Sequence, residues 1–154
     1  MSFRIRGLDP AQFRPFFALD NDALVARHMR SLVIDAPHSA PCRVTLRDVA
    51  PGERVLLLHY VHQSADTPYR TGGPIFVSEH GVEHFDGIDV LPPVFTGRTL
   101  SVRAYDKEGM MIDADSVESD PSGLFSRYFS DPATDYVHVH FARRGCFACR
   151  VDRT

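Results

Sequence analysis

The sequence HVHFARRGCFACRVDRT, residues 138–154, predicts the hairpin from which the rest of the fold can be worked out. Apolar and polar residues alternate on both sides of Arg143-Arg144-Gly145, as they do in two antiparallel strands that each bury one face. A glycine at the third loop position adopts the left-handed conformation that three-residue hairpin loops favour. We therefore expect strands over residues 135–142 and 146–152, joined by a loop of residues 143–145.

The register of this hairpin decides which side chains share a face. The expected cross-strand pairs are Ala142–Cys146, His140–Ala148 and His138–Arg150. One face is then wholly apolar and consists of Val137, Val139, Phe141, Phe147, Cys149 and Val151. The other face carries His138, His140, Cys146, Arg150 and Asp152. Cys149 is therefore expected to be a buried packing residue, whereas Cys146 is expected to lie diagonally across from His140.

The remaining sequence predicts an α+β fold with a mostly antiparallel sheet. Two short N-terminal helices are expected at residues 10–17 and 21–30, capped by Asp9 and Asp20, and one helix is expected over residues 121–129, before the C-terminal hairpin. Further strands are expected over residues 3–8, 42–46, 54–62, 75–77, 99–105 and 110–117. A chain of 154 residues without repeats or linkers is expected to form one domain over residues 1–154.

Two connecting segments are expected to be irregular. Residues 63–74 form a long polar connection, and such loops often carry functional side chains. Residues 81–97 contain two glycines and a proline pair. In the strand over residues 99–105, Arg103 is expected to form ion pairs with Asp113 and Asp115 of the neighbouring strand.

The composition gives no general attraction to nucleic acids or membranes. The chain carries 17 Lys and Arg against 20 Asp and Glu, a formal net charge of −3, whereas such surfaces are usually rich in positive charge. The longest apolar runs are of strand length, well short of the roughly 20 residues of a membrane-spanning helix. Because the start MSFRIRGLDP lacks the apolar stretch of a signal peptide, we expect a cytoplasmic protein whose three cysteines stay reduced.

The polar face of the hairpin supplies the candidate site. A cysteine beside an imidazole can act as a nucleophile or redox centre with the histidine as its base, which makes Cys146 and His140 candidate catalytic residues. Arginine side chains and backbone N–H groups near paired glycines can hold a carboxylate or phosphate. The leading hypothesis is thus a domain that binds a small anionic molecule, with or without thiol chemistry and with no cofactor. Its predicted ligand-binding residues are His62, Tyr69, Arg70, His138 and Arg150.

Two other hypotheses stay open. A His-x-His sequence on a strand places both imidazoles on one face, so His138, His140 and Cys146 are candidate zinc ligands of a metal-binding domain. If these side chains form only a solvated surface patch, the domain is a non-catalytic interaction module. The Cys146 and Cys149 pair does not favour a thioredoxin-like couple, because that chemistry uses cysteines at a helix N-terminus.

Three segments together point to a known family: PCRVTLRDVAPGERVLLLHYVHQSADTPYRTGGPIFV at residues 41–77, LSVRAYDKEGMMIDAD at 100–115 and YVHVHFARRGCFACRVDR at 136–153. On these segments the chain resembles the bacterial domain-of-unknown-function family 1203, from about residue 3 to residue 153. The resemblance implies a single compact domain and supplies no catalytic residues. Members tend to have proline at position 64 and asparagine at position 141, where this chain has Ser64 and Phe141.

Overall fold

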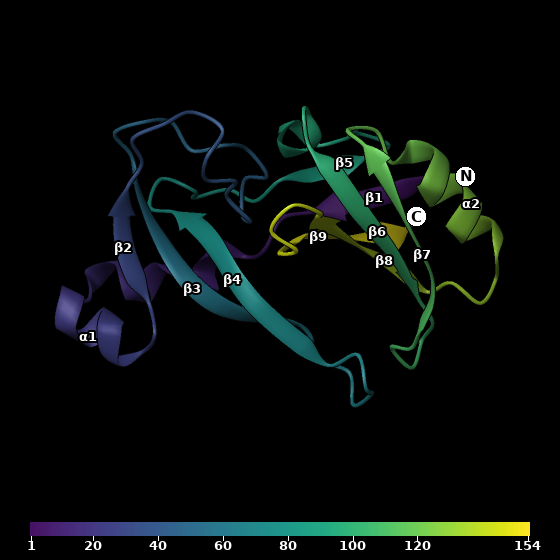
Figure 1. Ribbon diagram of the computed structural model, residues 1–154, viewed down its shortest axis with the longest axis horizontal. Helices are drawn as coiled ribbons and strands as arrows, with labels where there is room; N and C mark the ends of the chain where they lie inside the picture. The colour runs from purple at the N-terminus through teal and green to yellow at the C-terminus, as the bar shows by residue number, and fades with distance from the viewer.

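Two antiparallel sheets lie side by side in the computed structural model, which describes residues 1–154 (Figure 1). The smaller sheet has the order β2-β3-β4, with β2 Arg30–Val33, β3 Arg54–Gln63 and β4 Thr71–Ser78. The larger sheet has the order β5-β1-β9-β8-β6-β7. Its strands are β1 Phe3–Arg6, β5 Asp86–Ile88, β6 Thr99–Tyr105, β7 Met111–Glu118, β8 Tyr136–Phe141 and β9 Phe147–Arg153. The predicted α+β class is confirmed, and the division into two sheets is a new finding.

The helices are few and short. The two α-helices are α1 Asn21–Ala26 and α2 Ser122–Ser130, and three 3₁₀ turns are η1 Pro10–Gln12, η2 Arg14–Ala18 and η3 Pro93–Phe95. Asp20 caps α1 as predicted, because its Oδ1 accepts a 2.8 Å hydrogen bond from the Ala23 N–H. The helix does not reach Arg30, since His28 takes a left-handed conformation at φ 59° and ends the helical path. No helix is long and apolar enough to cross a membrane.

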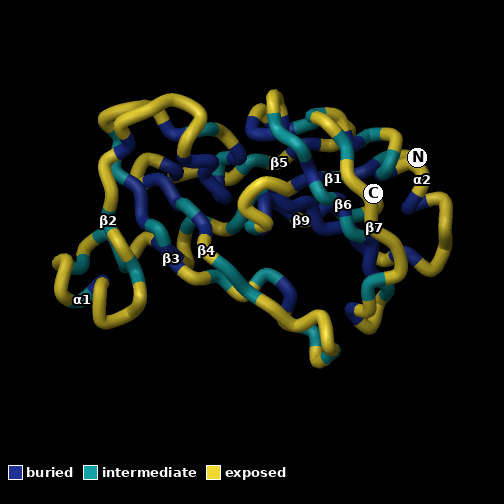
Figure 2. The backbone as a smooth tube through the Cα atoms, in the orientation of Figure 1, coloured by how far each residue is buried: buried dark blue, intermediate teal, exposed yellow.

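Each sheet has its own hydrophobic core, and in Figure 2 the inner strands carry most of the buried segments, whereas the edge strands β2 and β7 are largely exposed. In the larger sheet, Phe125 and Phe129 of α2 pack with apolar side chains of β6, β8 and β9. In the smaller sheet, Leu24 of α1 packs with side chains of β3 and β4. The middle strand of the smaller sheet is β3, and its first half is buried whereas His59 and Val61 are exposed. The apolar run of this strand is therefore buried at its start, whereas its end is partly open to solvent.

The end of β3 and the loop after it reach the larger sheet. Gln63 donates a 2.8 Å hydrogen bond from Nε2 to the hydroxyl of Tyr136 in β8. Thr67 donates to the carbonyl of Gly109, in the turn between β6 and β7, at 3.2 Å. Gly109 has φ +85°, and a Cβ there would lie 2.3 Å from the Cβ of Ala65, so the two loops meet where only glycine fits. The connection is shorter than predicted, because residues 71–74 belong to β4.

The segment over residues 42–46 is not the predicted strand. Its backbone turns, with the Leu46 N–H bonded to the Cys42 carbonyl at 3.0 Å and Leu46 at φ 49°. Arg43, which alternates with the apolar residues Cys42 and Val44, is only 1% exposed. Its guanidinium donates to the backbone carbonyls of Phe147 and Pro41, which explains how a polar residue in an alternating pattern can point inward.

The C-terminal hairpin contains a β-bulge that the sequence did not reveal. His138 pairs with Arg150 as predicted, but His140 pairs with Phe147 because the register shifts between Val139 and His140. Ala148 is the extra residue of the bulge. Because of it, the side chains of β9 between Ala148 and the hairpin turn lie on the face opposite to the one predicted. Gly145 takes the predicted left-handed conformation at φ 77°. The predicted faces are therefore wrong for Cys146 and Phe147, which exchange places.

Candidate metal centre

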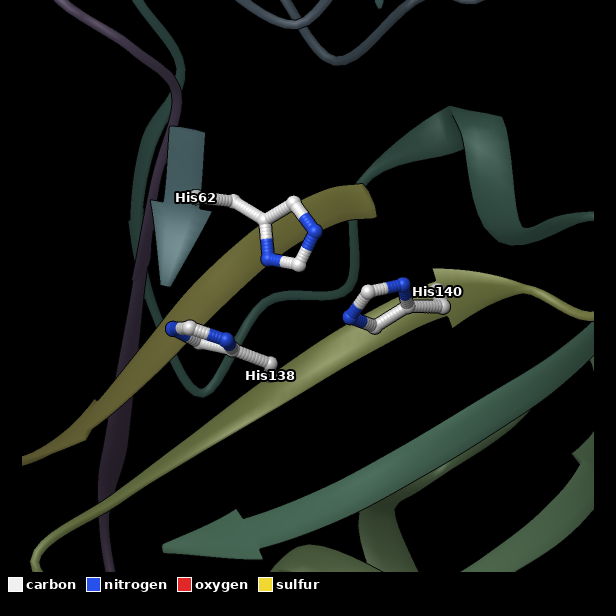
Figure 3. A group of neighbouring side chains, drawn as sticks. All are labelled: His62, His138 and His140. Carbon is white, nitrogen blue, oxygen red and sulfur yellow. The ribbon is translucent and has the colours of Figure 1, made fainter. Parts of the chain in front are cut away.

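Three histidines from two sheets meet at one point (Figure 3). His138 and His140 lie two residues apart on β8 and so share a face. His62 is the next-to-last residue of β3 and approaches them from the smaller sheet. One ring nitrogen of each histidine lies within 4.8 Å of the corresponding nitrogens of the other two.

The imidazole nitrogens at this point lack hydrogen-bond partners. His138 is 2% exposed, His140 is 1% exposed, and His62 is half-buried. Nδ1 of His62, Nδ1 of His138 and Nε2 of His140 are buried and form no hydrogen bond. The other nitrogen of His140, Nδ1, lies 3.0 Å from the Gly145 carbonyl oxygen. A carbonyl can only accept, so Nδ1 carries the proton and Nε2 keeps a free lone pair.

All three histidines are neutral at physiological pH. Burial, the largest cause, lowers the pKa of His62 to about 4, of His138 to about 2 and of His140 to about 3. The positive charge of Arg103 lowers all three pKa values further. Neutral imidazole is the form that binds a metal ion, so these rings need lose no proton to act as ligands.

Aromatic rings hold the three imidazoles in place. The ring of Phe147 stacks on His62 at a centroid distance of 5.0 Å and an interplanar angle of 2°. It also meets His138 edge-on at 5.2 Å. The rings of Tyr105 and Tyr136 have their centroids 5.0 and 5.1 Å from that of His138. They lie on the side of His138 that faces away from the β8–β9 hairpin turn. The bulge at Ala148 is what brings Phe147 to this face.

Two arginines of the larger sheet flank His138. Arg150 pairs with it across β8 and β9, and Arg103 pairs with it across β8 and β6. The charge of Arg150 is paired with that of Asp152, because the Arg150 Nε donates a 2.7 Å hydrogen bond to the Asp152 Oδ1. The Arg150 guanidinium also lies 4.0 Å from the centroid of the Tyr136 ring. Arg103 has no acidic partner, and its Nε donates to the Ser101 hydroxyl at 3.2 Å.

The predicted ion pairs of Arg103 do not form. Asp113 and Asp115 pair in register with Ala104 and Val102, so their side chains lie on the other face of the sheet from Arg103. Both carboxylates instead contact Arg127 of α2, at 3.6 and 3.2 Å. The sequence did not indicate that β8 pairs with β6 and brings His138 opposite Arg103.

Cys146 does not join the histidines. The bulge places its side chain against the core of the larger sheet, where its Sγ accepts a 3.1 Å contact from Arg43. The predicted ligand set of His138, His140 and Cys146 is therefore wrong in one member, because the third side chain that meets the two histidines is His62 and not Cys146. The predicted pairing of the Cys146 thiol with His140 as its base is likewise replaced by the contact with Arg43. Cys149 is buried in the core, as predicted.

The remaining predicted ligand-binding residues lie at the edge of this centre or outside it. Tyr69 meets Tyr105 edge-on at a centroid distance of 6.3 Å, so the loop after β3 reaches the aromatic rings that surround His138. Arg70 is exposed and donates to the Ser64 carbonyl within its own loop. Two surface hollows of about 440 and 260 Å³ lie elsewhere, and none of the predicted site residues lines either one.

A comparison with protein families places the chain. Residues 39–153 match the family described as "Protein of unknown function (DUF1203)". The chain belongs to the DUF1203 family. The three histidines of this DUF1203 chain, together with Arg103 and Arg43, all lie in the matched region. No curated protein and no solved structure matches the chain.

Proposed function

We propose that the chain binds one divalent transition-metal ion, such as zinc, through His62, His138 and His140. The observation that carries this proposal is the meeting of three buried, unpartnered ring nitrogens. Leaving a buried polar atom without a partner costs roughly 1–3 kcal/mol, and such atoms often mark the place of an ion or a water molecule. Imidazole is also the commonest protein ligand of transition metals.

The geometry supports a metal of this kind. Zinc binds imidazole nitrogens at about 2.1 Å, so tetrahedral ligand nitrogens lie roughly 3.4 Å apart. The three nitrogens, within 4.8 Å of one another, reach that spacing if the rings move by about 1 Å. The hydrogen bond between His140 Nδ1 and the Gly145 carbonyl is of the type that orients metal-binding histidines.

Three protein ligands leave one coordination position open, as in catalytic rather than structural zinc sites. A water molecule at such a position is acidified by the metal and becomes a nucleophile near neutral pH.

A cytoplasmic location remains part of the proposal, supported by three cysteines that form no disulfide.

The first test is calorimetric titration of zinc into protein stripped with EDTA and then desalted. We expect one equivalent to bind. A His62→Phe variant keeps an aromatic ring against Phe147 but removes one of the three ligands, so its zinc affinity should fall about 100-fold, which corresponds to roughly 3 kcal/mol of binding free energy.

Two variants serve as controls. His59→Phe makes the same change at an exposed position of the same strand and should leave zinc affinity unchanged. Cys146→Ser distinguishes the proposed ligands His62, His138 and His140 from the set with Cys146 that the sequence predicts, and it should also bind zinc normally. Binding of less than a tenth of an equivalent by the stripped wild-type protein, or equal affinity of the His62→Phe variant, would refute the proposal.

A further inference from the structure

The charges around the three histidines are unsuited to a bare cation. Besides the three histidines themselves, the positive groups that act on them are Arg103, Arg150 and Arg43, and each of these lowers an imidazole pKa. No carboxylate belongs to the ligand group. Three neutral imidazoles leave the two positive charges of a divalent ion uncompensated, so a negative ligand is needed to balance the site.

Arg103 is the group best placed to hold that negative ligand. It lies directly opposite His138 in the sheet register. Unlike Arg150, whose charge is matched by Asp152, it has no acidic partner. A guanidinium carries five N–H donors in a plane, and in Arg103 the Nε donates to Ser101 and another donor faces the Tyr105 hydroxyl, which leaves further donors free. The free donors match the two oxygens of a carboxylate or phosphoryl group.

We infer that the open coordination position takes the oxygen of a small oxyanion, a carboxylate or a phosphoryl group, whose second oxygen is bound by Arg103. This inference rests on the metal site proposed above and names its substrate class. One oxygen would bind the metal and the other the guanidinium, so the oxyanion would offset part of the positive charge of both groups.

The surroundings favour a small ligand or the end of a longer one. Phe147, Tyr105 and Tyr136 pack closely around the histidines. His62 and Arg103 are both only partly buried, and they form the side of the centre that solvent can reach. Tyr69, which is 37% exposed and meets Tyr105, lies where the remainder of a longer ligand would emerge.

The inference can be tested on protein loaded with Co²⁺, whose visible absorption reports the ligands of the metal. Acetate and inorganic phosphate are titrated separately into the loaded protein. Each should change the Co²⁺ spectrum with a single saturable binding curve. In an Arg103→Met variant, the anion affinity should fall about 10- to 100-fold, because a charge-assisted bidentate contact is lost.

The affinity for Co²⁺ itself separates the possible explanations. Removing the positive charge of Arg103 should raise the Co²⁺ affinity measured without oxyanions, whereas a purely structural loss would lower it. The control Arg150→Met should change anion affinity less than about twofold, because that charge is already paired. If Co²⁺ binds but neither anion alters its spectrum, or if Arg103→Met binds both anions normally, the inference is wrong while the metal site stands. If Co²⁺ does not bind, the proposed function itself fails.

Discussion

Replacing Arg43 with alanine is expected to lower the free energy of unfolding by about 3–5 kcal/mol. The guanidinium is buried at 1% exposure and donates to the carbonyls of Phe147 and Pro41. Without it, both carbonyls lose their side-chain donor inside the protein, and the space filled by the side chain becomes a cavity. Urea denaturation followed by circular dichroism measures the change directly.

Two further variants show whether hydrogen bonding causes this loss. Arg43→Met restores most of the side-chain volume but none of the donors, so it should still destabilise the protein by about 2 kcal/mol. Arg47→Ala removes an exposed arginine from the same turn and should change stability by less than about 0.5 kcal/mol. A typical point mutation lowers the free energy of unfolding by about 1 kcal/mol. If Arg43→Ala lowers it by no more than that, the buried guanidinium adds little to stability.

Acid is expected to destabilise the metal-free protein well above the pH range of ordinary carboxylates. In the folded state the pKa of His138 is about 2 and that of His140 about 3, mainly because of burial. In the unfolded chain both titrate near 6.5. As the pH falls below 6.5, the unfolded state takes up protons that the folded state cannot, so stability present above pH 6.5 is progressively lost.

Between pH 7 and pH 5, each of these two histidines should contribute a loss of about 2 kcal/mol, or about 4 kcal/mol together. His62 adds less, because it is half-exposed and its charge is screened by solvent. The positive charges of Arg103, Arg150 and Arg43 act against protonation of these rings in the folded state.

Urea denaturation in EDTA at pH 7, 6 and 5 tests the expectation. A His140→Phe variant should show roughly half the pH dependence, since one of the two titrating rings is gone. His80→Phe, which changes an exposed histidine, should follow the wild-type curve. Equal stability of the wild-type protein at pH 7 and pH 5 would mean that the histidines are protonated in the folded state as easily as in the unfolded one.

Elements defined by short-range patterns were predictable from the sequence. The strand over residues 99–105 occurs with the predicted bounds, because alternation and the turn at Gly109 fix it locally. Asp20 caps its helix and Gly145 takes its left-handed conformation for equally local reasons. His138 and His140 could be placed on one face, because side-chain alternation along a strand depends only on the strand itself.

The rest depended on contacts between distant segments. Ala148 has no property that marks it as an extra residue, yet the bulge there exchanges the faces of Cys146 and Phe147. The inward turn of Arg43 depends on carbonyl acceptors, one of them about a hundred residues away in Phe147. His62 was a candidate by its place at a strand end, but its approach to β8 follows from how two sheets meet.

The origin of the three histidines in different sheets gives the proposed ion a mechanical role. His62 belongs to the smaller sheet, whereas His138 and His140 belong to the larger one, and the chain has no disulfide between them. An ion held by all three would act as a reversible cross-link between remote segments and would restrict the unfolded chain as a disulfide does. A chelator would then uncouple the two halves, and hydrogen exchange in β2, β3 and β4 would quicken before the larger sheet loosens.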